Sequence, residues 1–176
     1  MNPSRILVAA SRGRTVIHRG WSLLERGLEG LQGPALLAAR LYVAWVFLAS
    51  GLQSLRDWSA TLWLYANCFQ VPLLPPAWAA VLGTAGELLL PPLLAFGLLG
   101  RFAALGLFVV NAVALASYLH SQHVAWSMIG MQLNPAMMFH FIWGLLLLAL
   151  SLWGPGAWSL DAWRARRGGG GRLQAA

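Results

Sequence analysis

Four apolar stretches, each about as long as a bilayer is thick, make up most of this chain and limit what it can fold into. They cover residues 35–55, 76–100, 102–119 and 136–153. A hydrocarbon core of about 30 Å requires roughly 20 apolar residues in helical form. Because lipid offers the backbone no hydrogen bonds, such segments cross a membrane as helices. The sequence therefore predicts an all-α, polytopic membrane protein built as a four-helix bundle.

The composition agrees with a membrane protein and removes other classes. The chain is 59% hydrophobic and only 10% charged, which lies outside the usual balance of a soluble domain. Its net charge of +7 comes with 12 basic residues, all of them arginine. Almost all of these arginines lie outside the spans, so the predicted partner is the lipid bilayer and not nucleic acid. The single cysteine, Cys68, excludes an intrachain disulfide.

The positions of the arginines predict how the spans are oriented. Five arginines precede the first span, Arg101 lies between the second and third, and four arginines follow the fourth. The other two connections contain only Arg56, next to Asp57. Cytoplasmic loops carry the excess of basic residues. Both termini are therefore expected in the cytoplasm, with the connections 56–75 and 120–135 on the outer side.

The segments outside the spans are short and basic. Residues 1–34 are rich in arginine, and a helical apolar stripe recurs in them every three or four residues, at Ile17, Trp21, Leu24, Leu28 and Leu31. This pattern predicts an amphipathic helix over about 16–31 that lies in the cytoplasmic interface. We expect the chain to turn into the membrane at Gly33-Pro34. An organellar transit peptide is the alternative for this start. Residues 164–176 are expected to form a flexible basic tail.

Three of the polar side chains inside the spans matter most, because a polar group is costly there and tends to face the bundle interior. At a rise of about 1.5 Å per residue, Glu87 lies about 16 Å from the outer surface and Asn111 about 14 Å from the inner one. Arg40 lies about 9 Å deep, within reach of Glu87 for a long side chain. These depths predict a buried Arg40–Glu87 pair with Asn111 beside it. Such a cluster is either an interhelical clamp or a proton or ligand site.

Metal and catalytic patterns are weaker. The pair His120-x-x-His123 is followed by four methionines, and imidazole and thioether both suit copper. His140, at the outer end of the fourth span, could ligate haem, but it has no matched histidine at equal depth. We disfavour both because short histidine patterns arise often by chance. No nucleophile–base pair or carboxylate dyad is present, so the sequence does not settle whether the chain is an enzyme.

Three segments resemble the DoxX family of small four-helix membrane proteins. They are FLASGLQSLRDW (47–58), GELLLPPLLAFGLLGRFAAL (86–105) and HFIWGLLLLALSLWGPGAWSLDAW (140–163). The resemblance covers residues 35–163, which form the predicted four-helix domain. One departure is Ser54, where many members have lysine. The family positions matched here are Arg40, Gly51, Gln53, Glu87, Arg101, Gly154, Pro155, Gly156, Ser159, Leu160 and Asp161.

The resemblance implies a multi-pass protein of the bacterial plasma membrane. The family takes its name from a subunit associated with a thiosulfate:quinone oxidoreductase. This implies a membrane subunit of a quinone- or sulfur-linked redox system, with soluble or membrane redox partners. A ligand or proton site would then involve Glu87, Arg40, Asn111 and Gln53, with quinone as the ligand. The alternative is a non-catalytic scaffold or small-solute carrier, in which the Arg40–Glu87 pair is purely structural.

The end of the fourth span has a local structural meaning. Gly154-Pro155-Gly156 is expected to stop the helix at the membrane surface. Ser159 or Asp161 is then expected to cap a short interfacial helix.

Overall fold

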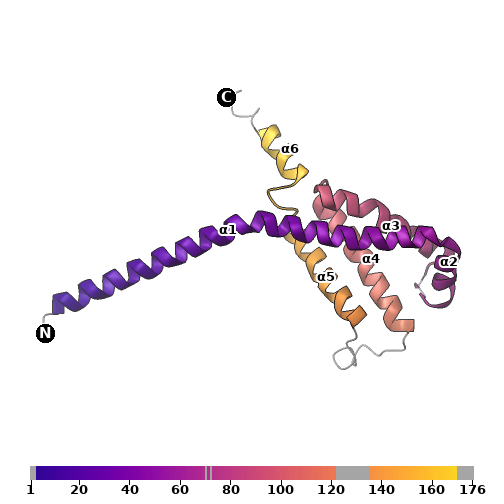
Figure 1. Cartoon of the computed structure of the whole chain (residues 1–176), viewed down its shortest axis with the longest axis horizontal. Helices are drawn as coiled ribbons and strands as arrows, with labels where there is room; N and C mark the ends of the chain where they lie inside the picture. Colours follow the sequence, from indigo (N-terminus) through magenta and orange to yellow (C-terminus); the bar gives the residue numbers. More distant parts are fainter. Residues whose placement is uncertain (1–2, 70, 72, 122–134, 170–176) are drawn as a thin grey trace. The chain divides into compact units, whose positions relative to one another are not determined.

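The regular secondary structure of the residues that the structure, a computed structural model, describes is entirely helical. The described residues are 3–69, 71, 73–121 and 135–169, and none of them forms a strand. Six helices follow one another (Figure 1): α1 (Pro3–Arg56), α2 (Trp58–Asn67), α3 (Pro76–Phe96), α4 (Gly100–Ser121), α5 (Pro135–Trp153) and α6 (Leu160–Gly169). The all-α prediction is therefore confirmed.

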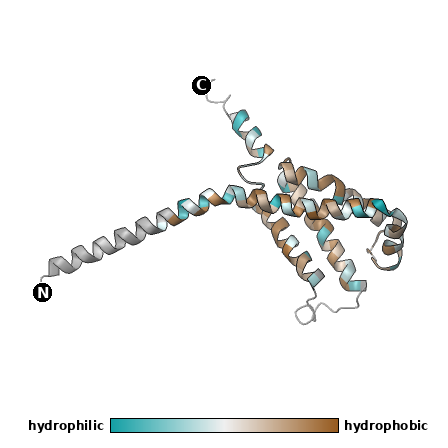
Figure 2. Ribbon diagram, viewed as in Figure 1, coloured by the Kyte–Doolittle hydropathy of each residue, from teal (hydrophilic) through white to brown (hydrophobic). Residues whose placement is uncertain are grey.

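Three of these helices contain segments long and apolar enough to cross a membrane. They are Leu24–Arg56 within α1, Pro76–Phe96, and Gly100–His120 within α4. The fourth predicted span corresponds to α5, whose apolar part, Met137–Trp153, is shorter. Figure 2 shows how strongly apolar residues dominate α3, α4 and α5. The chain is thus a multi-pass membrane protein whose helices lie in lipid.

The chain divides into two compact units, Met1–Ala35 and Leu36–Ala176. The first unit is helical where it is described, and its apolar side chains Trp21, Leu24, Leu28 and Leu31 are exposed. The predicted turn at Gly33-Pro34 is wrong, because α1 is helical on both sides of Pro34. A proline inside a helix removes one backbone hydrogen bond but does not have to end the helix.

The core of the second unit is shared by four helices. Its buried residues are Val43 and Phe47 of α1, Leu94 of α3, Ala103, Ala104 and Leu107 of α4, and Leu147 and Leu150 of α5. Small residues allow helix backbones to approach closely within a membrane. Gly83 and Gly86 of α3 are close-packing positions, because a Cβ atom there would meet the side chains of Tyr65 and Val110 respectively.

Helix α2 covers one end of this unit and packs on α3. It begins at Asp57, whose carboxylate accepts a hydrogen bond of 2.9 Å from the backbone N–H of Ala60. That bond and a second one from the Ser59 hydroxyl lower the pKa of Asp57. The Thr61 hydroxyl then donates to the Ser54 carbonyl oxygen at 2.9 Å, which ties α2 to the end of α1.

Candidate functional site

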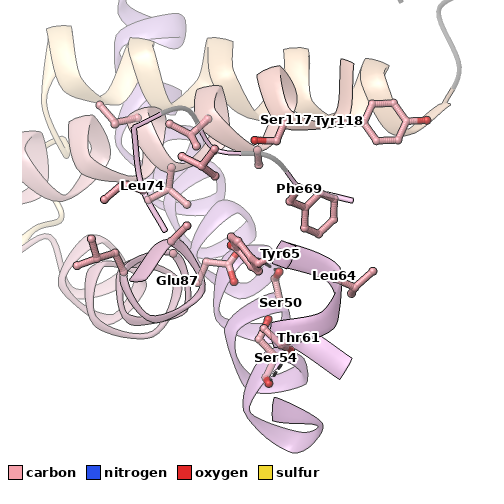
Figure 3. A pocket seen from close by; sticks show the side chains of 18 of the residues that line it. Ser50, Ser54, Thr61, Leu64, Tyr65, Phe69, Leu74, Glu87, Ser117 and Tyr118 are labelled. Atoms are coloured by element: carbon pink, nitrogen blue, oxygen red, sulfur yellow. Dashed lines mark hydrogen bonds between the residues drawn. The ribbon is translucent and has the colours of Figure 1, made fainter. Parts of the chain in front are cut away.

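A pocket of about 400 Å³ lies among α1, α2, α3, α4 and α5 (Figure 3). Most of its lining is apolar, contributed by valine, leucine, alanine and phenylalanine side chains. A few polar side chains interrupt this surface, namely Ser50, Ser54, Thr61, Tyr65, Glu87, Ser117, Tyr118 and His140. Apolar pockets of this size with a few polar groups are the usual form of small-molecule sites.

Glu87 is held on the wall of this pocket by α1. The Ser50 hydroxyl donates a hydrogen bond of 3.0 Å to Oε1 of the Glu87 carboxylate. The neighbouring Gly51 allows this approach, because a Cβ atom there would lie only 2.9 Å from Cβ of Glu87. One turn later, Pro91 has no N–H to donate to the Glu87 carbonyl oxygen. Glu87 therefore lies where Gly51 brings α1 close to α3 and where the α3 hydrogen bonding is interrupted.

Tyr65 reaches the same place from α2. Its hydroxyl lies over Gly83, which leaves no room for a side chain there. Figure 3 shows Tyr65, Ser50 and Glu87 turned toward one another. Desolvation raises the pKa of the Tyr65 phenol, and the nearby charge of Glu87 raises it further. The phenol is thus kept protonated and available as a hydrogen-bond donor.

Arg40 lies away from the pocket, and the predicted Arg40–Glu87 pair is wrong. Nη1 of Arg40 donates to the Pro155 carbonyl oxygen at 2.8 Å, and Nη2 donates to the Trp158 carbonyl oxygen at 2.7 Å. The side chain is buried, with 1% exposed. A long cationic side chain extends toward the nearer polar end of its helix and not toward the bilayer centre. Counting residues along the helix gives the depth of Arg40 and the reach of its side chain, but not the direction in which the side chain points.

Asp161 is the acidic neighbour of Arg40, and it also caps α4. The carboxylate accepts hydrogen bonds from the backbone N–H groups of Leu99, at 3.1 Å, and Gly100, at 2.8 Å. A negative charge at a helix N-terminus complements the helix dipole. The Ser159 hydroxyl accepts a bond of 3.1 Å from the Ala162 N–H and so caps α6. The two predicted capping residues therefore serve different helices.

The segment Gly154-Pro155-Gly156 follows α5 and lies next to the arginines. Helix α5 ends at Trp153 as predicted, and Gly154 and Gly156 have φ values of 90° and 83°. Such a left-handed backbone favours glycine. The guanidinium of Arg101 packs against Gly154. We call the set Arg40, Arg101, Gly154, Pro155, Gly156, Ser159 and Asp161 the arginine junction. None of its members lines the pocket.

Asn111 does not lie beside an Arg40–Glu87 pair but holds His140. Nδ2 of the Asn111 amide donates to the His140 carbonyl oxygen at 2.9 Å, and Oδ1 lies 2.9 Å from Nδ1 of the His140 ring. The ring packs edge-on against Trp143, with 5.3 Å between the ring centroids. His140 lines the same pocket as Glu87, a connection that the sequence had not indicated.

The remaining candidates are Gln53 and the predicted metal ligands. Gln53 is exposed and does not line the pocket. His123 falls outside the described residues, so the weak copper hypothesis for His120 and His123 stays a prediction. Among the residues that the structure describes, no group of three or more histidine, cysteine, aspartate or glutamate side chains is placed to hold a metal ion.

Sequence reasoning missed the pocket residues Ser50, Tyr65 and Ser117. Ser50 and Ser54 are four residues apart and share one face of α1, which could have marked a polar stripe. In the sequence, Tyr65 looks like any aromatic residue near a membrane surface, where aromatic residues are common. No sequence signal distinguished Ser117.

The chain is similar in sequence to known proteins. Residues 35–121 match the DoxX family. An uncharacterized protein of Haemophilus influenzae is 37% identical over 94 residues, which cover 49% of this chain and 59% of that protein. No solved structure matches the chain. The match spans the first three predicted membrane segments and includes Arg40, Gly51, Glu87 and Arg101. Residues 35–121 of this membrane protein belong to the DoxX family.

Proposed function

We propose that this protein is a membrane component of a quinone- or sulfur-linked redox system and that it binds a quinone-type ring in the pocket beside Glu87. The observation that carries the proposal is the pocket itself, with a volume of about 400 Å³ and a mainly apolar lining. This volume lies within the range of small-molecule sites, roughly 300–1,000 Å³. An apolar ring with two polar atoms is complementary to such a surface.

The proposed membrane arrangement follows the charges. Helix α1 from residue 35, α3, α4 and α5 cross the plasma membrane of a bacterium as a four-helix bundle. Both termini lie in the cytoplasm, because the arginines flank the spans on that side. In this orientation the pocket opens toward the outer half of the bilayer, with α2 beside it.

Four polar groups of the pocket have a proposed role. Tyr65 and Ser117 donate hydrogen bonds to a ring oxygen, since both are hydroxyl groups on the pocket wall. Glu87, oriented by Ser50, receives a proton when the bound ring changes its protonation state. The redox chemistry is supplied by the quinone together with a soluble or membrane partner protein. This protein would bind and orient the ring and handle its protons.

Binding of a quinone to the purified protein in nanodiscs tests this proposal. Decylubiquinone is titrated into the wild type and into two variants. Glu87→Gln changes the polar group, and Gly83→Leu displaces the Tyr65 hydroxyl, which leaves no room for a side chain at Gly83. We expect saturable binding by the wild type and a clear loss in both variants. Gln53→Ala is the matched control, because Gln53 is exposed outside the pocket. Absence of saturable binding by the wild type, or full binding by Gly83→Leu, would count against the proposal.

A non-catalytic scaffold is the second candidate, and the arginine junction favours it. Buried Arg40 is bound to backbone carbonyls, and Asp161 bridges to the start of α4. This arrangement fixes helix ends and needs no ligand. If the wild type binds no ring compound while Arg40→Met lowers only the stability, the scaffold is the better description.

A further inference from the structure

The structure assigns a specificity role to His140. We infer that His140, oriented by Asn111, makes the pocket select a ring that carries a hydroxyl group, a hydroquinone or a phenol, over the corresponding quinone. This inference rests on the proposed binding function and names the form of the ligand. It follows from the hydrogen bonds that Asn111 makes with His140 and from the polar atoms that these bonds leave free.

The first step is the orientation of the Asn111 amide. One end of the amide lies 2.9 Å from the backbone carbonyl oxygen of His140. A carbonyl oxygen only accepts hydrogen bonds, so the amide NH₂ group must occupy that end. The amide oxygen then faces Nδ1 of the imidazole at 2.9 Å. In the flipped amide, the amide oxygen would face the backbone carbonyl oxygen of His140. Two acceptors cannot form a hydrogen bond, so the flipped form is excluded.

The second step is the tautomer of His140. The amide oxygen also only accepts, so Nδ1 of His140 must carry the proton. A neutral imidazole has a single ring N–H, which leaves Nε2 with a free lone pair. Asn111 is buried, with 3% of its surface exposed, so water does not compete for this contact. His140 lines the pocket, and in the inferred tautomer its only unprotonated ring nitrogen, Nε2, is an acceptor for a ligand there.

The third step is the match to a ligand. The ring oxygens of a quinone are acceptors and cannot satisfy Nε2 of His140, whereas a ring hydroxyl can donate to it. Ser117, 3% exposed, also lines the pocket, and its hydroxyl has no hydrogen-bond partner among the described residues. That hydroxyl can donate to the same ligand oxygen or accept from a second one. The pocket therefore combines a fixed acceptor with a free hydroxyl, a pattern complementary to a hydroxyl-bearing ring.

The affinities of decylubiquinone and its reduced form, measured anaerobically in nanodiscs, test the inference. We expect the hydroquinone to bind roughly tenfold more tightly, the effect of about one net hydrogen bond. His140→Phe keeps a ring but removes the acceptor, and we expect it to abolish this preference. Val110→Ala is the matched control, because it alters an apolar pocket residue and should change both affinities by the same factor. Each variant is first checked for thermal stability and monodispersity.

The outcomes separate this inference from the proposed function. Saturable binding with equal or tighter affinity for the quinone would overturn the inference and leave the proposed function standing. No binding of either form would overturn both. Preference for the hydroquinone that persists in a folded His140→Phe variant would also overturn the role of His140.

A second measurement needs no ligand. In protein labelled with ¹⁵N-histidine, the His140 signal, assigned by its absence in His140→Gln, should show a protonated Nδ1 and an unprotonated Nε2. Asn111→Leu should lose this preference, because no side chain then fixes the tautomer. A neutral His140 protonated at Nε2 in the wild type, or an unchanged tautomer in folded Asn111→Leu, would contradict the positioning role of Asn111.

Discussion

Replacing Arg40 with methionine removes the central contact of the arginine junction while keeping a side chain of similar length. The guanidinium donates two hydrogen bonds, of 2.8 Å to the Pro155 carbonyl oxygen and 2.7 Å to that of Trp158. Hydrogen bonds made by a charged group contribute about 1.5–3 kcal/mol each, so the two together are worth about 3–6 kcal/mol.

Part of that contribution is offset within the native structure. Burying a guanidinium costs free energy, and Nε of Arg40 has no hydrogen-bond partner in the described part of the chain. In Arg40→Met, Asp161 would also lose a nearby positive charge, which adds to the loss of stability. We therefore expect Arg40→Met to lower the free energy of unfolding by about 2–4 kcal/mol.

The assay is reversible unfolding in mixed micelles with increasing sodium dodecyl sulfate, followed by tryptophan fluorescence and circular dichroism. Arg56→Met is the matched control, since Arg56 is exposed at the end of α1 and its loss should cost no more than about 0.5 kcal/mol. Equal free energies of unfolding for the two variants would refute the idea that Arg40 holds the junction together. Ligand affinity per folded molecule should stay unchanged in Arg40→Met, because Arg40 does not line the pocket.

Three further predictions concern close packing, capping and ionisation. Gly51→Ala forces a Cβ atom to within 2.9 Å of Cβ of Glu87 and should destabilise the protein by about 1–3 kcal/mol in a thermal melt. Gly27→Ala, which has nothing within 4 Å, should instead be neutral or stabilising by up to about 1 kcal/mol. Asp161→Asn weakens the charged cap of α4 and should cost about 1 kcal/mol in the same assay; an unchanged melting temperature would contradict this. The pKa of Tyr65 is raised in the folded protein. The protonated phenol therefore stabilises the fold fully below the ordinary tyrosine pKa near 10, and this stabilisation is lost as the pH rises through the raised pKa. The difference in phenolate absorbance between the wild type and Tyr65→Phe, followed against pH, measures the ionisation of Tyr65. Glu87→Gln should make Tyr65 ionise at a lower pH.

Elements along the chain were predictable because they depend on local composition. Lipid imposes a length of about 20 apolar residues on each crossing helix, so hydropathy located the spans. The end of α5 at Gly154-Pro155-Gly156 follows from backbone conformations that few residues other than glycine adopt. The exception was Gly33-Pro34, where a helix-breaking pair lies within a continuous helix.

The side-chain partners were decided by the tertiary structure. The depths of Arg40, Glu87 and Asn111 follow from counting residues, but depth does not give the rotation of each helix about its own axis. That rotation directs Arg40 to the backbone after α5 and Asn111 to His140. The pocket depends in addition on α2, whose Tyr65 reaches Gly83. By itself the sequence determined that helices cross a membrane and where they lie along the chain, since burial in lipid constrains each segment independently. Only the tertiary structure decided which polar groups meet, because each contact requires two helices to present the right faces at the same depth.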